Sequence, residues 1–248
     1  SGTLSWATPA SGASIGGAVT SGTAGSVLFA SSTAILGQNN ANFFWDTANL
    51  RLGIGTNTPS STLHVAGNIT IPVSTASTAG VLMKGANRFL HDFALSGTTG
   101  LNTFLGINAG NFTMTGSTGA SGSYNTGLGH ESLTANTTGA QNTATGYQSL
   151  NANTTGSSNT ASGLQSLRNN TSGGYNTASG DSSLYTNTTG SNNTSSGYRS
   201  LHLSTTGSSN SSFGYNSLYS NTTASNNTAV GYQASYTNAT GTPNTAVG

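Results

Sequence analysis

The stretch that decides the fold is Asn-Thr-Ala-Thr-Gly-Tyr-Gln-Ser-Leu-Asn-Ala-Asn-Thr-Thr-Gly, at residues 142–156. It returns with small changes, as Asn-Thr-Ala-Ser-Gly at 159–163 and 176–180, and it closes the chain as Asn-Thr-Ala-Val-Gly at 244–248. Lead asparagines follow one another at a constant spacing of 17 residues, at 125, 142, 159, 176, 193, 210, 227 and 244. A fixed period of this kind is the mark of a stacked-repeat architecture.

One repeat is too short for a pair of helices, and its glycine, asparagine and threonine disfavour helix formation. Two short runs, Asn-Thr-Ala-x-Gly-Tyr and Ser-Leu-x-x-Asn-Thr, each end at a turn residue, so we expect both to be extended. The chain is therefore predicted to be all-β, with a parallel β-solenoid or β-roll of 17-residue coils. Successive coils would stack about 4.8 Å apart.

The repeat places identical side chains in columns that run from coil to coil. We expect structural ladders of leucine (Leu133, Leu150, Leu167, Leu184, Leu201, Leu218) and of the lead asparagines (Asn125, Asn142, Asn159, Asn176, Asn193, Asn210, Asn227, Asn244). A second asparagine column contains Asn136, Asn153, Asn170, Asn187, Asn221 and Asn238. One large apolar side chain per coil is a thin core set against the entropy cost of folding. We therefore predict self-association, as a homotrimer, a head-to-tail filament or both.

Tyrosines also recur in register. Tyr185, Tyr219 and Tyr236 share one column, and a second column contains Tyr147, Tyr198, Tyr215 and Tyr232. Stacking between coils is one interpretation of these columns. Contact with surface glycans by Tyr147, Tyr198, Tyr215 and Tyr232 is the other, and the period alone does not separate the two.

The rest of the chain divides by composition into three further segments. Residues 1–26 are rich in glycine and serine and predict an extended linker or assembly strand. Short apolar runs between turn residues predict a β-hairpin module at 27–71, and residues 72–101 predict a collar. The solenoid domain is expected at 102–248, with a first lead asparagine at Asn102 and a surface loop at 114–123 before the second.

Three motifs carry a resemblance to known fibres. Leu-Gly-Ile-Gly-Thr at 52–56, Thr-Pro at 58–59 and Leu-His-Val-Ala-Gly at 63–67 resemble a segment of phage tail-fibre and bacterial surface-fibre proteins. Residues 102–111, Asn-Thr-Phe-Leu-Gly-Ile-Asn-Ala-Gly-Asn, are similar to another. The repeats resemble the head domains of trimeric autotransporter adhesins. The resemblance implies a trimeric, extracellular fibre on a cell surface or a virion.

Composition excludes several other classes. Only 4% of the 248 residues are charged, the net charge is +1 and cysteine is absent. We therefore expect no nucleic-acid partner, thiolate metal site or disulfide, and no apolar run is long enough to span a membrane. The acids Asp46, Asp92, Glu131 and Asp181 are scattered, as are the histidines. We predict no catalytic, metal or cofactor site, and hence no enzyme.

The leading hypothesis is a structural fibre, either a stalk or an adhesin. A glycan-binding adhesin head is one alternative. An ice-binding solenoid is another, using the threonine column Thr137, Thr154, Thr171, Thr188, Thr205 and Thr222. Asn-x-Ser/Thr sequons also make glycosylation a hypothesis, at Asn136, Asn153, Asn187, Asn221 and Asn238.

Overall fold

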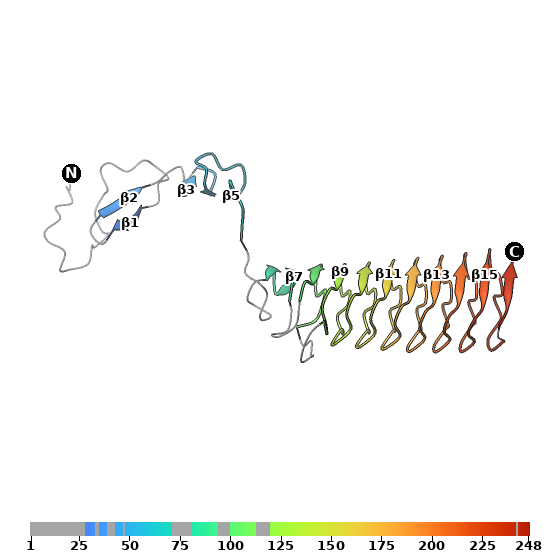
Figure 1. Cartoon of the computed structure of the whole chain (residues 1–248). Coiled ribbons are helices and arrows are strands. Elements are labelled where there is room, and N and C mark those ends of the chain that lie inside the picture. Colours follow the sequence, from blue (N-terminus) through green and yellow to red (C-terminus); the bar gives the residue numbers. More distant parts are fainter. Residues whose placement is uncertain are drawn as a thin grey trace. The chain divides into compact units, whose positions relative to one another are not determined.

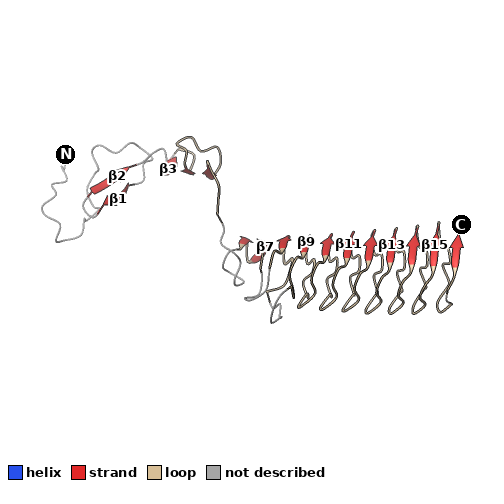
Figure 2. Ribbon diagram, viewed as in Figure 1, coloured by secondary structure: helices blue, strands red, loops and turns tan. Residues whose placement is uncertain are grey.

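A computed structural model describes residues 28–32, 35–38, 43–46, 48–70, 81–93, 100–112, 120–241 and 243–248. The chain forms two compact units, Ser1–Thr70 and Ile71–Gly248. The segment 1–26, predicted as a linker, lies outside the described residues, as does most of the predicted loop at 114–123. No helix occurs in the described ranges, which confirms the all-β prediction (Figure 2).

The first unit contains two small sheets. Strands β1 (Leu28–Ser32) and β2 (Ile35–Gln38) form an antiparallel pair. Strands β3 (Phe43–Asp46) and β4 (Arg51–Ile54) form the predicted kind of hairpin, and β5 (Leu63–Val65) joins β4 in parallel. Asp46 stabilises the β3–β4 turn by accepting the backbone N–H groups of Ala48 and Asn49 at 3.1 and 3.2 Å.

The second unit is built on one eleven-stranded sheet (Figure 1). An antiparallel hairpin of β6 (Leu82–Lys84) and β7 (Asn87–His91) opens it, and β7 pairs antiparallel with β8 (Thr103–Leu105). The parallel strands that follow are β9 (Thr126–Leu128), β10 (Thr143–Thr145), β11 (Thr160–Ser162), β12 (Thr177–Ser179), β13 (Thr194–Ser196), β14 (Ser211–Phe213), β15 (Thr228–Val230) and β16 (Thr245–Val247).

Each of these strands comes from a successive coil of the solenoid. From β9 onward the paired residues are 17 positions apart, as in Thr143↔Thr160 and Ala144↔Ala161. The predicted parallel β-solenoid of 17-residue coils is therefore confirmed. Positions in a coil are numbered below from 1 at the lead asparagine, so that the strand occupies positions 2 to 4 and position 5 is glycine.

Only the first of the two predicted extended runs is a strand. The run Ser-Leu-x-x-Asn-Thr forms consecutive turns, because the leucine at position 9 adopts a left-handed backbone, with φ between 48° and 54° in six coils. The residue at position 7 is left-handed too, for example Gln165 with φ of 55°. Left-handed backbone disfavours a branched side chain such as leucine. The expectation of a second strand was wrong because closure of a 17-residue coil overrides the local preference.

Burial explains why the strained leucine is retained. All six leucines of the predicted ladder are fully buried, and the position-3 alanines, such as Ala144 and Ala161, face them across the coil. The serine at position 8 is also buried; Ser166, for example, donates its hydroxyl to Gly163 O. Burying one leucine contributes about 1.5–3 kcal/mol per coil, enough to offset a strained backbone of about 1–2 kcal/mol.

Asparagine ladders run through the buried interior. The amide oxygen of Asn142 accepts the backbone N–H of Asn159 at 3.0 Å and its side-chain amide at 3.2 Å, while Asn159 Nδ2 also donates to Gly173 O. The same contacts recur in five consecutive coils, from Asn142 to Asn210. Each coil is thereby bonded to the next through a buried side chain as well as through the sheet.

The second asparagine column, at position 12, is interrupted. Asn153, Asn170 and Asn187 each donate to the amide oxygen one coil before, at 2.7–3.0 Å. The next coil has Ser204, whose shorter side chain does not reach. Asn187 Oδ1 and Ser204 Oγ are consequently buried without a hydrogen-bond partner. Asn221 and Asn238, predicted to belong to this ladder, donate to carbonyl oxygens within their own coils instead.

An aromatic cluster closes the first coil of the solenoid. Phe104 occupies position 3, where the next coil has glycine and the coils after it have alanine or serine, and is fully buried. Its ring centroid lies 4.9 Å from that of His91, and the His91 ring packs at a tilt on Phe112, with 4.4 Å between centroids. Space for Phe104 comes from the next coil, where position 3 is Gly127. A Cβ atom there would lie 2.8 Å from the Phe104 ring.

Substitution of Ser204 by asparagine should extend the interrupted ladder. An asparagine at this position can donate to Asn187 Oδ1 and to Gly207 O, as its counterparts do in earlier coils. At about 1 kcal/mol for each buried hydrogen bond gained, the melting temperature of Ser204→Asn should rise by roughly 2–4 °C or more. Thermal unfolding followed by circular dichroism measures this.

Ser209→Asn, which changes an exposed serine of the same coil at a position where other coils have Asn192 and Asn226, is the control and should leave the melting temperature almost unchanged. A lower melting temperature for Ser204→Asn would mean that the coil cannot accommodate the amide.

Candidate functional site

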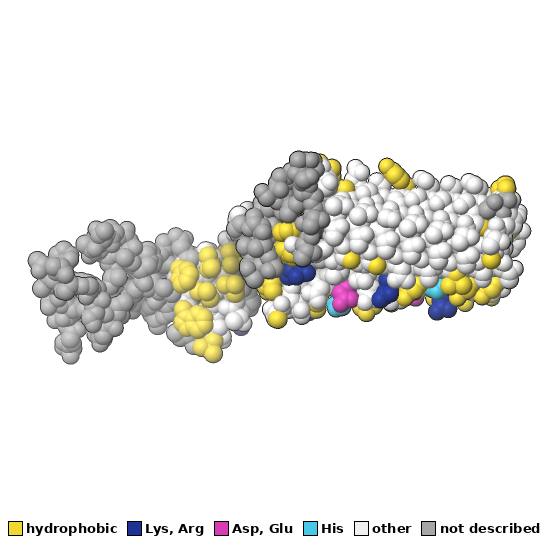
Figure 3. All heavy atoms as spheres, turned by 90° about the horizontal axis from the view of Figure 1, so that it is seen from below, with side chains coloured by type: hydrophobic (Ala, Val, Ile, Leu, Met, Phe, Trp, Pro, Cys, Tyr) yellow, Lys and Arg dark blue, Asp and Glu magenta, His cyan; other side chains and the backbone are white. Residues whose placement is uncertain are grey.

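The charged and histidine side chains of residues 102–248 lie at a few neighbouring positions of the coil. In residues 102–248 the charged side chains are Glu131, Arg168, Asp181 and Arg199, at positions 7, 10, 6 and 7 of their coils. Figure 3 shows charged and histidine side chains along one margin of the solenoid, beside a surface of small polar groups. Positions 6, 7 and 10 therefore make up the candidate site.

Two aromatic stacks run along this margin. At position 6, Tyr198, Tyr215 and Tyr232 stack at centroid distances of 5.2 and 5.3 Å. The stack at position 10 contains a histidine, in the order Tyr185, His202, Tyr219, Tyr236, with separations of 5.1, 5.2 and 5.0 Å. Tyr147 stacks at 5.4 Å on His130. Sequence reasoning had not placed His202 in a tyrosine column, although its spacing from Tyr185 and Tyr219 was visible.

The stacking geometry limits what the tyrosines can bind. Interplanar angles in the two stacks lie between 3° and 19°, so each inner ring has both faces covered by its neighbours. Tyr215, predicted as a glycan contact, lies between Tyr198 and Tyr232 and offers only its edge and hydroxyl group. A sugar ring packs on the face of an aromatic ring. The arrangement thus favours coil-to-coil stacking over a glycan track.

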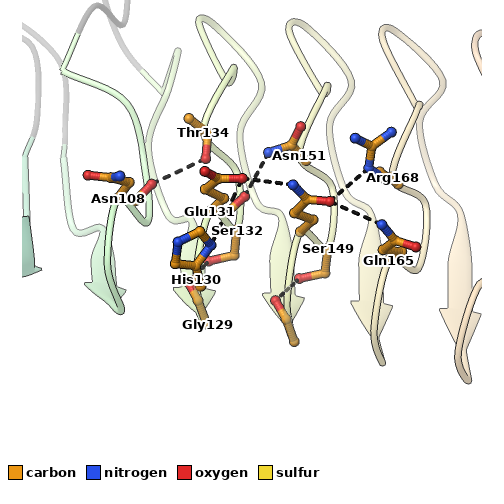
Figure 4. Close-up of polar contacts among 12 residues, drawn as sticks. Asn108, Gly129, His130, Glu131, Ser132, Thr134, Ser149, Asn151, Gln165 and Arg168 are labelled. Carbon is orange, nitrogen blue, oxygen red and sulfur yellow. Dashed lines mark hydrogen bonds and ion pairs between the residues drawn. The ribbon is translucent and has the colours of Figure 1, made fainter.

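Glu131 is held in a polar network that crosses three coils (Figure 4). Its carboxylate accepts Gln148 Nε2 at 2.8 Å, and His130 Nδ1 lies 3.9 Å away. The amide oxygen of Gln148 then accepts Gln165 Nε2 at 3.1 Å and Arg168 Nε at 3.0 Å. This chain of contacts ties charged groups of neighbouring coils together.

Asp181 and His202, the second acid and the second histidine of this margin, both bond to Ser182. Asp181 accepts the hydroxyl of Ser182, and His202 Nδ1 donates to Ser182 O at 2.9 Å. Burial between Tyr185 and Tyr219 lowers the pKa of His202, and nearby Arg199 lowers it further, against the opposing effects of the Ser182 carbonyl and Asp181. His202 is thus a neutral ring in the stack.

The structure bears directly on the predicted glycosylation sites. Asn136, Asn153, Asn187 and Asn221 are fully buried, and each donates its side-chain amide to a carbonyl oxygen of its own coil. The folded solenoid gives a glycosyltransferase no access to these four nitrogens, so the hypothesis is corrected there. Asn238 is half-buried, with its amide bonded to Gly241 O at 3.0 Å.

The threonine column proposed for ice binding has an internal role. Each of its six hydroxyl groups donates to the backbone oxygen of the next coil at 2.9–3.1 Å, as Thr154 does to Thr171 O. These threonines at position 13 therefore fasten coil to coil and do not present free hydroxyl donors. The hypothesis cannot rest on this column.

No group of three or more histidine, cysteine, aspartate or glutamate side chains that could hold a metal ion occurs in the described ranges. The same part of the chain has no helix long and apolar enough to cross a membrane. Comparisons with models of known families, with curated proteins and with solved structures found no match for the chain.

Acidification should destabilise the second unit through His91, which is buried, and His202, which is half-buried. Burial lowers the pKa of both His91 and His202, so the unfolded chain binds these protons more tightly than the folded one. Stability is complete above the unfolded value of about 6.5 and is lost as the pH falls through it. The melting temperature should fall between pH 7.5 and pH 5.5.

In His202→Tyr, which continues the position-10 tyrosine stack, this fall should be smaller. His130→Tyr, which removes the more exposed imidazole of the margin, should retain the wild-type fall. Equal pH dependence in wild type and His202→Tyr would contradict the role given to His202.

Proposed function

We propose that this chain is a structural segment of an extracellular fibre and that it self-associates in a trimer or a filament. The observation that supports this most is the continuity of the coil-to-coil bonding. The parallel sheet from β8 to β16, the leucine column and the lead-asparagine ladder all run along one axis. Eight strand spacings of about 4.8 Å give this part a length of roughly 38 Å.

The side chains that could have formed a reactive site support the same proposal by their positions. Glu131 bonds to Gln148 in the next coil, Arg168 bonds to Gln148 in the coil before, and His202 stacks between two tyrosines. In each case the polar or aromatic group is used to join coils. A stalk requires this kind of contact, repeated without interruption along its axis.

The test of the fibre proposal is the native mass of the whole chain. Light scattering after size exclusion, with electron microscopy of the same sample, should show elongated particles of more than one chain. A compact, monodisperse monomer across the micromolar range would contradict the proposal.

A second candidate function, ice binding, is favoured by the outward face of the sheet. Position 2 presents an outward column of threonines in which Ser211 replaces one member and Ser211 and Thr194 are half-buried. The exposed members are Thr103, Thr126, Thr143, Thr160, Thr177, Thr228 and Thr245. A parallel sheet repeats these hydroxyl and methyl groups at about 4.8 Å. A regular, uncharged array of this kind is suited to ordering water.

If this face binds ice, purified protein should show thermal hysteresis, and Thr160→Tyr should remove most of it by breaking the flat array. Thr155→Tyr changes an exposed threonine on a turn of the coil before and should have no effect. Absence of hysteresis in the wild type would dispose of this candidate.

A further inference from the structure

Exposed apolar side chains of the solenoid are concentrated beside one turn of the coil. The large exposed apolar residues of residues 100–112, 120–241 and 243–248 lie at position 4 or position 6, except for Leu101, Tyr124 and Tyr175. Position 5, between these two columns, is glycine in every coil. A Cβ atom at Gly163, for example, would lie 2.5 Å from Gly180 O. No side chain therefore stands between the two columns.

Position 4 belongs to a row that crosses the whole eleven-stranded sheet. Strand register aligns it in this order: Leu82, Leu90, Leu105, Leu128, Thr145, Ser162, Ser179, Ser196, Phe213, Val230, Val247. Four leucines stand at one end, four hydroxyl side chains in the middle and three apolar residues at the other end. The exposed fraction of the seven apolar members ranges from 36% to 81%.

We propose that this row, with its position-6 neighbours Tyr147, Leu164, Tyr198, Tyr215 and Tyr232, is the seam along which a second copy of this chain docks. The inference rests on the proposed fibre function and names its contact surface. A row with a repeat of about 4.8 Å is matched coil by coil by a partner with the same repeat, and another solenoid of this sequence has it.

The order of side chains along the row favours the same partner. Because hydroxyl groups occupy the middle and apolar groups both ends, a second copy brings apolar residues against apolar residues in either direction. No member of the position-4 row is charged, so like charges do not oppose each other within it. The position-6 column has one charged residue, Asp181, whose carboxylate accepts the hydroxyl of Ser182. The position-6 tyrosines present ring edges and hydroxyl groups, and tyrosine is enriched in protein interfaces.

The size of the seam is sufficient for a specific contact. Ten strand spacings give a length of about 48 Å, and two columns about 7 Å apart, with their side chains extending to either side, make a strip about 10 Å wide and roughly 500 Å² in area for each copy. Two copies then bury about 1,000 Å², which is the lower range of specific protein interfaces.

A matched pair of variants tests the proposal. Leu128→Ser/Phe213→Ser/Val230→Ser replaces three apolar members of the row by the residue that the row has at Ser162, Ser179 and Ser196. The control, Tyr124→Ser/Tyr175→Ser, removes exposed apolar side chains at position 17, where Ser158 and Ser209 are natural. We expect the seam variant to need at least tenfold higher concentration to associate, with an unchanged circular dichroism spectrum. The control should associate as the wild type does.

Cross-linking gives a second measurement that does not depend on destabilising the contact. The chain has no cysteine, and Ser162 stands in the middle of the row, where either direction of docking brings two copies together. Under mild oxidation Ser162→Cys should form disulfide dimers at least tenfold faster than Ser172→Cys, which lies exposed on a turn in the same coil.

Outcomes separate this proposal from the fibre proposal. A multimeric chain that associates equally well in both serine variants, or that cross-links equally at both cysteines, overturns the seam and leaves the fibre proposal standing. A chain that is monomeric at every concentration overturns both.

Discussion

Everything in the solenoid depends on a buried asparagine that bonds to its counterpart one coil away. The lead asparagine satisfies a backbone N–H, a side-chain amide and a glycine carbonyl at once, all inside the coil. An unpaired buried polar group costs about 1–3 kcal/mol, so these contacts are retained only if each coil returns its lead asparagine to the same place in the stack. The constant period of the sequence is the result of this requirement. It also explains why one buried leucine per coil is enough, since the asparagine hydrogen bonds stabilise the contact between coils as well.

This arrangement requires a strained backbone at several residues of each coil. In a typical coil, positions 7, 9 and 17 are left-handed without being glycine, as in Gln165, Leu167 and Tyr175. Such strain persists where the surroundings fix it, and here the fixed surroundings are the coils before and after. Phe104 and the His91 cluster provide such surroundings at the first coil, where no identical coil precedes.

Much of the solenoid could be predicted from the sequence, because residues 17 positions apart in the sequence lie next to each other in adjacent coils. The period predicted the parallel stacking and placed Leu167 and Asn159 in columns that are buried in the structure. Local propensity failed where the coil must turn: a leucine that favours extended or helical backbone is left-handed, and the second run is not a strand. The sequons at Asn136 and Asn153 and the threonine column at Thr154 looked like surface features, since serine, threonine and asparagine are usually exposed. Their inward roles depend on the position of each residue around the coil, which a column alone does not reveal. The pairing of Phe104 with Gly127 was not predicted either, because both residues depart from the alanine or serine that the other coils have at position 3.

One consequence concerns how such a chain can change in length. The interval from Asn102 to Asn125 is six residues longer than the period, yet Thr103 and Thr126 still pair in register. Extra residues are thus tolerated without a change of register, whereas a complete copy of 17 residues would add one coil to the stack. Duplication or loss of whole repeats would lengthen or shorten the solenoid in increments of about 4.8 Å without any new interface having to evolve. The length of the solenoid is therefore set by the number of repeats in the sequence.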